Sequence, residues 1–137
     1  HYVVGKPTLV MPTGGYGNYS LLGGTAPTAT YGSTSQLGQL VSGNLNVNFG
    51  NGTVFVNIGT KFGTTAVNIV NQVGYISGST FRGCSTNNYE TNVVGIFTGT
   101  SAYRAGLVYS TQSGGPLGTV AGAAAFQRTG SNYFSTP

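Results

Sequence analysis

The sequence predicts an all-β domain, an eight-stranded antiparallel up-and-down β-barrel preceded by an extended N-terminal arm. Three observations lead to this prediction. Apolar and polar residues alternate with a period of two in the clearest segments, 24 glycines supply tight turns, and no window keeps the 3.6-residue apolar period of a helix. Only residues 101–104 resemble a single helical turn. A chain of 137 residues suits one domain with one core.

The clearest element is a hairpin over residues 44–58. Its first strand alternates asparagines with apolar side chains, and its second strand resumes the alternation after the turn Gly50-Asn51-Gly52. One face of this hairpin is therefore expected to be buried and the other to be mainly polar. The side chains predicted for the buried face are Leu45, Val47, Phe49, Val54, Val56 and Ile58.

Six further segments complete the eight predicted strands. In chain order they are residues 19–22, 67–72, 73–82, 92–100, 105–111 and 119–128. Ile76 and Phe81 lie five residues apart within one segment, so a β-bulge is expected to bring both to the same face. Val70 disturbs the alternation of the segment before it.

Strands of this kind bury a shared face either by closing into a barrel or by folding as a sandwich. The last strand favours the barrel. Its inward set of Val120, Gly122, Ala124 and Phe126 mixes large and very small side chains, as a narrow interior requires. Closure also removes sheet edges, which a chain with few charges cannot protect by charge.

Charged residues are rare, with five Lys or Arg, one Glu and a net charge of +4. The cations are spread along the chain instead of forming a basic run, which argues against a nucleic-acid partner. Ser, Thr, Asn and Gln make up 48 of the residues, a surface chemistry more typical of extracellular or envelope proteins. No stretch approaches the roughly 20 apolar residues of a membrane-spanning helix.

The side chains of acid–base and metal chemistry are almost absent. His1 and Glu90 are the only members of their types and there is no Asp, so acid–base schemes and a Ser-His-carboxylate triad lack their groups. Cys84 has no partner in the chain for a disulfide, and it shares no metal-ligand spacing with His1 or Glu90. We therefore expect no enzyme, no catalytic residue, no metal site and no cofactor.

Two stretches resemble a known family. Residues 94–109 contain a G-x-F-x-G pattern that begins at Gly95, a short turn, and then a G-x-x-Y pattern that ends at Tyr109. Together with residues 118–126 they resemble the barrel of transferrin-binding protein B-like surface lipoproteins. The opening residues 2–8 look like the lead-in to similar barrels at the C-terminal end of FecR-type envelope proteins of Gram-negative bacteria. The resemblance implies an eight-stranded barrel, a cell-surface or extracellular location and no catalysis.

Two functions stay open. The first is a non-enzymatic extracellular or cell-surface module that acts in binding or as an accessory domain, as the resemblance implies. Nine tyrosines among many amides and hydroxyls suit a contact surface for sugar or protein, although β-propensity explains them as well. The alternative is a structural subunit of an extracellular filament or coat that self-assembles through terminal arms. The expected partners are a protein or copies of the chain itself.

The chain ends are the candidate subunit contacts. We expect an extended arm over residues 1–16, the barrel over 17–128 and a tail over 129–137, and the start at His1 leads us to expect a processed product or a domain of a longer precursor. Prolines at two positions limit the arm to an extended path. The apolar residues offered for contact are Val3, Val4, Leu9 and Val10 in the arm and Tyr133 and Phe134 in the tail.

Overall fold

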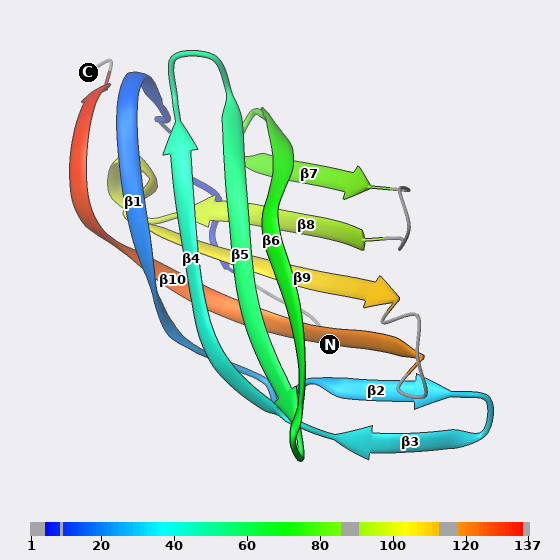
Figure 1. The fold of residues 1–137 in the computed structure, drawn as a ribbon. Helices are drawn as coiled ribbons and strands as arrows, with labels where there is room; N and C mark the ends of the chain where they lie inside the picture. The colour runs from blue at the N-terminus through cyan, green and yellow to red at the C-terminus, as the bar shows by residue number, and fades with distance from the viewer. Residues whose placement is uncertain (1–4, 9, 86–90, 113–117, 136–137) are drawn as a thin grey trace.

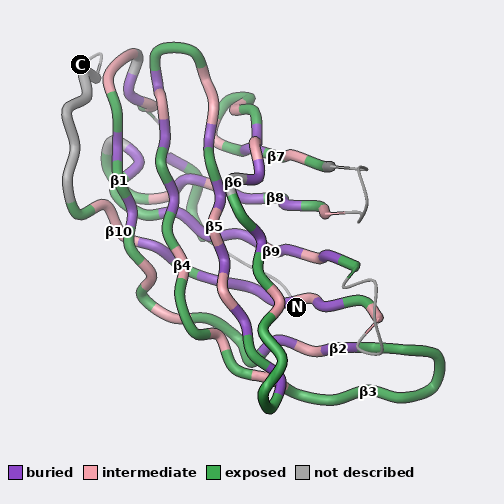
Figure 2. Tube along the Cα trace, in the orientation of Figure 1, coloured by how far each residue is buried: buried purple, intermediate pink, exposed green. Residues whose placement is uncertain are grey.

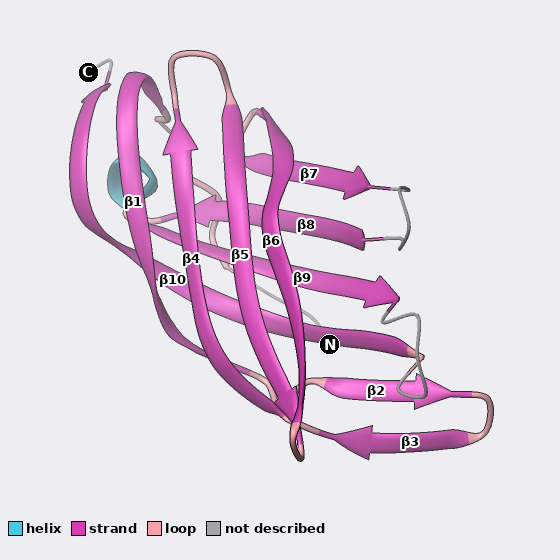
Figure 3. Ribbon diagram, viewed as in Figure 1, coloured by secondary structure: helices cyan, strands magenta, loops and turns pink. Residues whose placement is uncertain are grey.

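The computed structural model describes residues 5–8, 10–85, 91–112 and 118–135, without the side chains of residues 13, 71, 85, 101 and 130–135. In this part of the chain the protein is all-β apart from one 3-10 turn, η1 (Thr100–Ala102), which lies where the sequence predicts a helical turn (Figure 3). The strands are β1 (Pro12–Gly24), β2 (Thr28–Tyr31), β3 (Thr34–Leu37), β4 (Gln39–Asn48), β5 (Thr53–Phe62), β6 (Thr65–Ser77), β7 (Thr80–Ser85), β8 (Thr91–Thr98), β9 (Arg104–Gln112) and β10 (Thr119–Ser135).

Eight of these strands form a closed antiparallel barrel, which confirms the predicted fold class. Neighbours follow the order β1-β4-β5-β6-β7-β8-β9-β10, and β10 pairs back to β1. The β1–β10 ladder runs from the pair Pro12–Ser135 to the pair Gly24–Ala124. Figure 1 shows β1, β4, β5 and β6 on one side of the barrel and β7 to β10 crossing behind them.

The two remaining strands, β2 and β3, form a hairpin between β1 and β4 in the sequence, and it extends beyond the barrel. β2 continues along the edge of β10 that β1 occupies, pairing through Thr28 and Thr30, and β3 pairs only with β2. All four residues of β3 are exposed. The sequence prediction missed this hairpin because alternation is visible only where one face of a strand is buried.

The boundary between β6 and β7 corrects two predictions. Residues 67–72 and 73–82 were expected as separate strands, but β6 continues from the first segment into the second as far as Ser77, and the chain then turns into β7. Ile76 and Phe81 are therefore cross-strand partners, and no bulge lies between them. The bulge lies earlier in β6, where Val70 and Asn71 face the single residue Asn57 of β5. This extra residue is the physical reason that Val70 disturbs the alternation.

Buried and more exposed residues alternate along the barrel strands (Figure 2), and most of the buried apolar side chains form one core cluster. All six apolar side chains predicted for the buried face of the hairpin are buried, which confirms that prediction. Phe97 is fully buried at the centre of an aromatic cluster, with ring centroids 5.1 Å from Phe81, 5.9 Å from Phe49 and 6.0 Å from Tyr19. The Tyr19 hydroxyl donates a hydrogen bond to the carbonyl oxygen of Ala102 and ties β1 to η1.

The end strands run further than the barrel limits expected at residues 17 and 128. β1 begins at Pro12, and β10 continues to Ser135. The added residues are mainly Gly, Ser, Thr and Tyr, and they show no apolar alternation. Backbone pairing between β1 and β10, which requires no particular side chains, builds this part of the ladder.

Candidate functional site

A groove of about 790 Å³ opens where β6 and β7 diverge on the barrel wall. β6 pairs with β7 through only three residue pairs, from Tyr75–Arg82 to Ser77–Thr80, whereas β7 stays paired with β8 through six. Beyond Tyr75 the two strands separate, and the groove lies at this fork. It is lined by parts of β6, β7 and β8.

Gly83 explains how β7 passes so close to β6 at the fork. A Cβ atom at this position would lie 2.0 Å from the carbonyl oxygen of Val73 and 2.9 Å from the Cα of Gly74. Both contacts are with backbone, which cannot rotate away as a side chain can. Only glycine fits at this crossing, so residue 83 positions one wall of the groove.

The groove presents apolar side chains around one cation. Val70, Tyr75 and Val94 are 69%, 65% and 44% exposed, although they lie on strands of a folded barrel. Arg82 is the only charged residue among the described lining residues, and it is the cross-strand partner of Tyr75. Exposed apolar and aromatic side chains beside an Arg are the composition of protein contact surfaces.

Cys84 also lies at the groove and is exposed on β7. The remaining residues named for metal or acid–base chemistry, His1 and Glu90, lie outside the described residues. Within the described ranges, no three His, Cys, Asp or Glu side chains gather in one place. In the same ranges no helix has the length and apolar content needed to cross a bilayer.

Inside the barrel, one buried hydroxyl differs from the other buried polar groups. Thr60 donates to the carbonyl oxygen of Val67 at 2.6 Å, and Thr111 shares a hydrogen bond of 2.8 Å with Thr91. The Tyr109 hydroxyl has no partner among the described residues. Its ring lies against Gly122, where an added Cβ would be 2.3 Å from the hydroxyl oxygen. Burial raises the pKa of Tyr109 to about 12.

We expect Tyr109→Phe to stabilise the barrel by about 1–3 kcal/mol, because it removes a buried hydroxyl without a partner. The change also alters the pH dependence. In the folded state Tyr109 holds its proton more tightly than in the unfolded state, where a tyrosine titrates near 10. The free energy of unfolding therefore keeps its full value below pH 10 and declines as the pH rises toward 12, and Tyr109→Phe should remove this decline. Urea unfolding from pH 8 to 11.5 measures both effects.

Tyr31→Phe is the control for this prediction, because Tyr31 is 63% exposed. It should leave both the unfolding free energy and its decline above pH 10 unchanged. Equal pH slopes for Tyr109→Phe and the unchanged protein would contradict the assignment of this decline to Tyr109.

Part of the N-terminal arm lies on its own barrel. Pro7 forms a β-bridge with Thr98, and Thr8 donates from its backbone N–H to the carbonyl oxygen of Phe97 at 2.9 Å. Val10 is 47% exposed. Val3, Val4 and Leu9 lie outside the described residues. A subunit contact through the arm stays a prediction.

The expected tail contributes backbone to the last strand. Tyr133 and Phe134 pair with Gly15 and Gly14 of β1 within β10. Their side chains lie outside the described part of the structure, so their role in subunit contact also stays a prediction.

Neither family models nor curated proteins show a match to this chain. Solved structures do. A mutant of the vaccine antigen transferrin-binding protein B from Haemophilus parasuis Hp5 has a TM-score of 0.60 at 14% identity, covering 93% of this chain and 27% of its own. Isotype 1 transferrin-binding protein B from serogroup B Neisseria meningitidis has a TM-score of 0.54 at 15% identity, covering 87% and 26%.

The chain shares the barrel fold of these proteins. It spans about a quarter of their length, so the similarity covers only one part of each of those proteins. The expected resemblance is confirmed at the level of fold, whereas the FecR-type setting stays a prediction. At such low sequence identity the similarity shows a shared barrel fold and identifies no binding residue.

Sequence reasoning did not find the groove residues Tyr75 and Arg82. One signal was present, because Val70 and Tyr75 are apolar at positions that the structure places on the outside of β6. The missing information was the register that puts them beside Arg82 of β7. Register between strands is set by the whole barrel and cannot be read from either strand alone.

Proposed function

We propose that this chain is a non-catalytic binding module on the bacterial cell surface and that it holds a protein ligand at the β6–β7 groove. The observation that carries the proposal is the pair of exposed side chains Tyr75 and Val94 on either side of Arg82, with the exposed Val70 further along the same groove. A tyrosine and an arginine side by side are the residue types that most often dominate the energy of protein interfaces.

Two further facts support the proposal. The two solved structures described above are transferrin-binding proteins, which by their names bind a protein. The polar residues of the chain are mostly amides and hydroxyls, and few are charged, as is typical of proteins outside the cytosol. No described contact between copies of the chain favours the filament alternative, which stays a prediction.

A photo-crosslinker on Cys84 tests the proposal, because the chain has one cysteine and it lies at the groove. The labelled protein is mixed with a preparation of cell-surface and extracellular proteins and irradiated. The crosslinked protein is then identified by mass spectrometry. The purified ligand is then titrated against variants. Tyr75→Ala is expected to weaken binding about 30-fold, the effect of losing an interface anchor worth about 2 kcal/mol.

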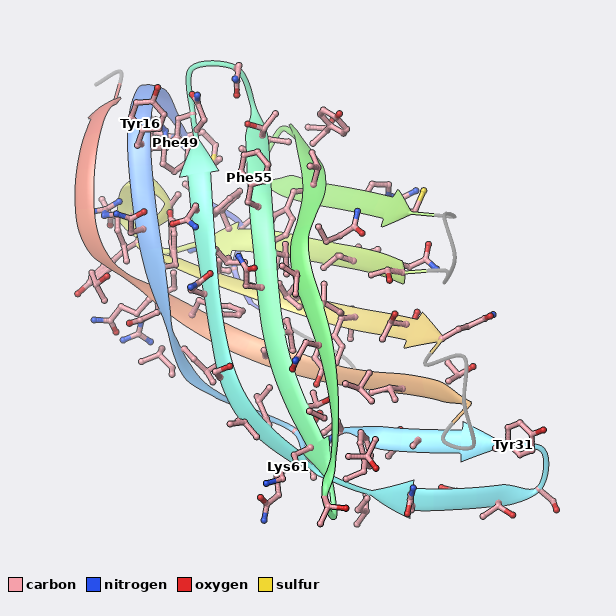
Figure 4. The ribbon with its side chains drawn as sticks, in the orientation of Figure 1. Tyr16, Tyr31, Phe49, Phe55 and Lys61 are labelled. Atoms are coloured by element: carbon pink, nitrogen blue, oxygen red, sulfur yellow. The ribbon has the colours of Figure 1, made fainter. Side chains whose placement is uncertain are left out.

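Tyr31→Ala is the matched control, because Tyr31 is 63% exposed but lies at the end of β2, away from the groove (Figure 4). It should change the affinity less than twofold. A second label at Ser33→Cys in a Cys84→Ser background should not give the same adduct. Equal losses from the two tyrosine variants, or the same adduct from both label positions, would contradict a ligand site at the groove.

A further inference from the structure

A second concave site lies on the outer face of β4, β5 and β6. This amide hollow has a volume of about 280 Å³, and Gly59 of β5 is among its lining residues. Ser42 of β4 and Asn68 of β6 are the cross-strand neighbours of Gly59. One step along the sheet, Asn44 of β4 pairs with Asn57 of β5. Polar side chains of three strands therefore surround a residue that has none.

The missing side chain at Gly59 makes the hollow. A Cβ atom there would lie 2.5 Å from Oγ of Ser42 and 3.4 Å from Oδ1 of Asn68, so these polar atoms lean over the glycine. The Nδ2 of Asn57 donates to Oδ1 of Asn44 at 3.0 Å, and this bond orients both amides. The site is thus partly organised before any ligand arrives, which lowers the entropy lost on binding.

The lining chemistry identifies the class of ligand. Amides offer both donors and acceptors, and a serine hydroxyl does the same. No charged side chain lines the hollow among the described residues. The nearest cation along the strand is Lys61, two residues after Gly59 near the end of β5, and it is not among the lining residues (Figure 4). A neutral ligand with many hydroxyl groups matches this set of uncharged donors and acceptors.

An aromatic ring completes the site on the same strand. Phe55 is 39% exposed and lies on the outer face of β5, two residues before Asn57 (Figure 4). The strand from Phe55 to Gly59 spans about 13 Å, enough for a short oligosaccharide. The C–H face of a sugar ring packs on an aromatic ring, while its hydroxyls reach the amides beside it.

We propose that the amide hollow and Phe55 bind a neutral oligosaccharide, with one ring stacked on Phe55 and the hydroxyls of the next held by Asn44, Asn57 and Asn68. The hollow adjoins the β6–β7 groove at Val70, which lines both, but the proposal does not depend on a protein ligand in the groove.

The test titrates neutral saccharides against ¹⁵N-labelled protein and follows the side-chain amide signals by NMR. The probes are lactose, maltotriose, cellotriose, mannotriose and chitotriose. At least one is expected to bind with a dissociation constant near or below about 1 mM and to shift the Asn44 and Asn57 amides. Asn57→Ala and Phe55→Ala should each weaken that binding at least about 10-fold, the loss of one or two good contacts.

Asn18→Ala is the matched control, since Asn18 is an exposed asparagine on β1, outside the hollow. It should leave binding unchanged. The double variant Ser42→Ala/Gly59→Ala fills the floor of the hollow while removing the Oγ atom that the new methyl would meet, so it should fold and lose binding. Near-ultraviolet circular dichroism checks its fold.

Three outcomes would overturn the proposal: no probe binding at concentrations up to about 10 mM, equal weakening by Asn18→Ala and Asn57→Ala, or tighter binding of glucose 6-phosphate than of glucose. A ligand found at the groove would leave these outcomes unaffected, so the two proposals can fail independently.

Discussion

Phe97→Ala is expected to lower the free energy of unfolding by about 3–5 kcal/mol, the usual loss when a buried phenylalanine is truncated. The ring is fully buried and contacts three other aromatic rings, from β1, the β4–β5 turn and β7. Its removal leaves a cavity that the three neighbouring rings fill only in part, because close packing in the core holds each of them in place. Urea unfolding followed by far-ultraviolet circular dichroism measures the loss.

Phe55→Ala serves as the matched control for Phe97→Ala. Phe55 is 39% exposed on the outer face of β5, so its truncation leaves no enclosed cavity and should cost clearly less than the truncation of Phe97. If the two variants lose similar stability, the aromatic cluster is not the centre of the folding energy.

Gly95→Ala is expected to destabilise the barrel by about 1–3 kcal/mol although it adds only one methyl group. The new Cβ would lie 2.1 Å, 2.5 Å and 2.6 Å from three ring atoms of Phe81. Phe81 is 1% exposed and packs on Phe97, so its ring has no open space to move into. The clash between the new methyl group and the Phe81 ring must be relieved by a strained rotamer of Phe81 or by separation of β7 from β8.

Gly23→Ala tests whether lack of space is the cause. Nothing lies within 4 Å of a Cβ added at Gly23, so this variant should be neutral or gain about 0.4–1 kcal/mol from a less flexible unfolded chain. Adding Phe81→Leu to Gly95→Ala should recover part of the loss. An equal effect of the two glycine variants, or no recovery, would argue against ring crowding.

The parts of the fold that the sequence predicts share one property, a strand with one buried face. The 44–58 hairpin shows this, because Val54 and Val56 face the core while Asn57 faces outward. Val70 shows the limit, since a single extra residue at the bulge reverses the alternation. β3 carries no alternation at all because every residue is exposed.

The candidate sites were less predictable than the fold, because each depends on contacts between strands. Alternating asparagines at 44 and 46 indicate a polar face, and the sequence reasoning predicted that much. It could not show that Gly59 lies between Ser42 and Asn68, because two inter-strand registers, one of them interrupted by a bulge, set that arrangement. The groove likewise depends on where β6 parts from β7.

The barrel closes between its first strand and its last, and this affects how it forms during synthesis. In the β1–β10 ladder the residues nearest in sequence, Gly24 and Ala124, are 100 positions apart. β1 leaves the ribosome early and can pair on one side with β4. Its other side stays unpaired until β10 is made, because β5 to β9 add in order after β4 and only β10 completes the ring. Such distant pairing carries a large loop-closure entropy and is slow. Until β10 has been released, the nascent chain is therefore an open sheet with an unpaired β1 edge, which must be kept from joining neighbouring chains.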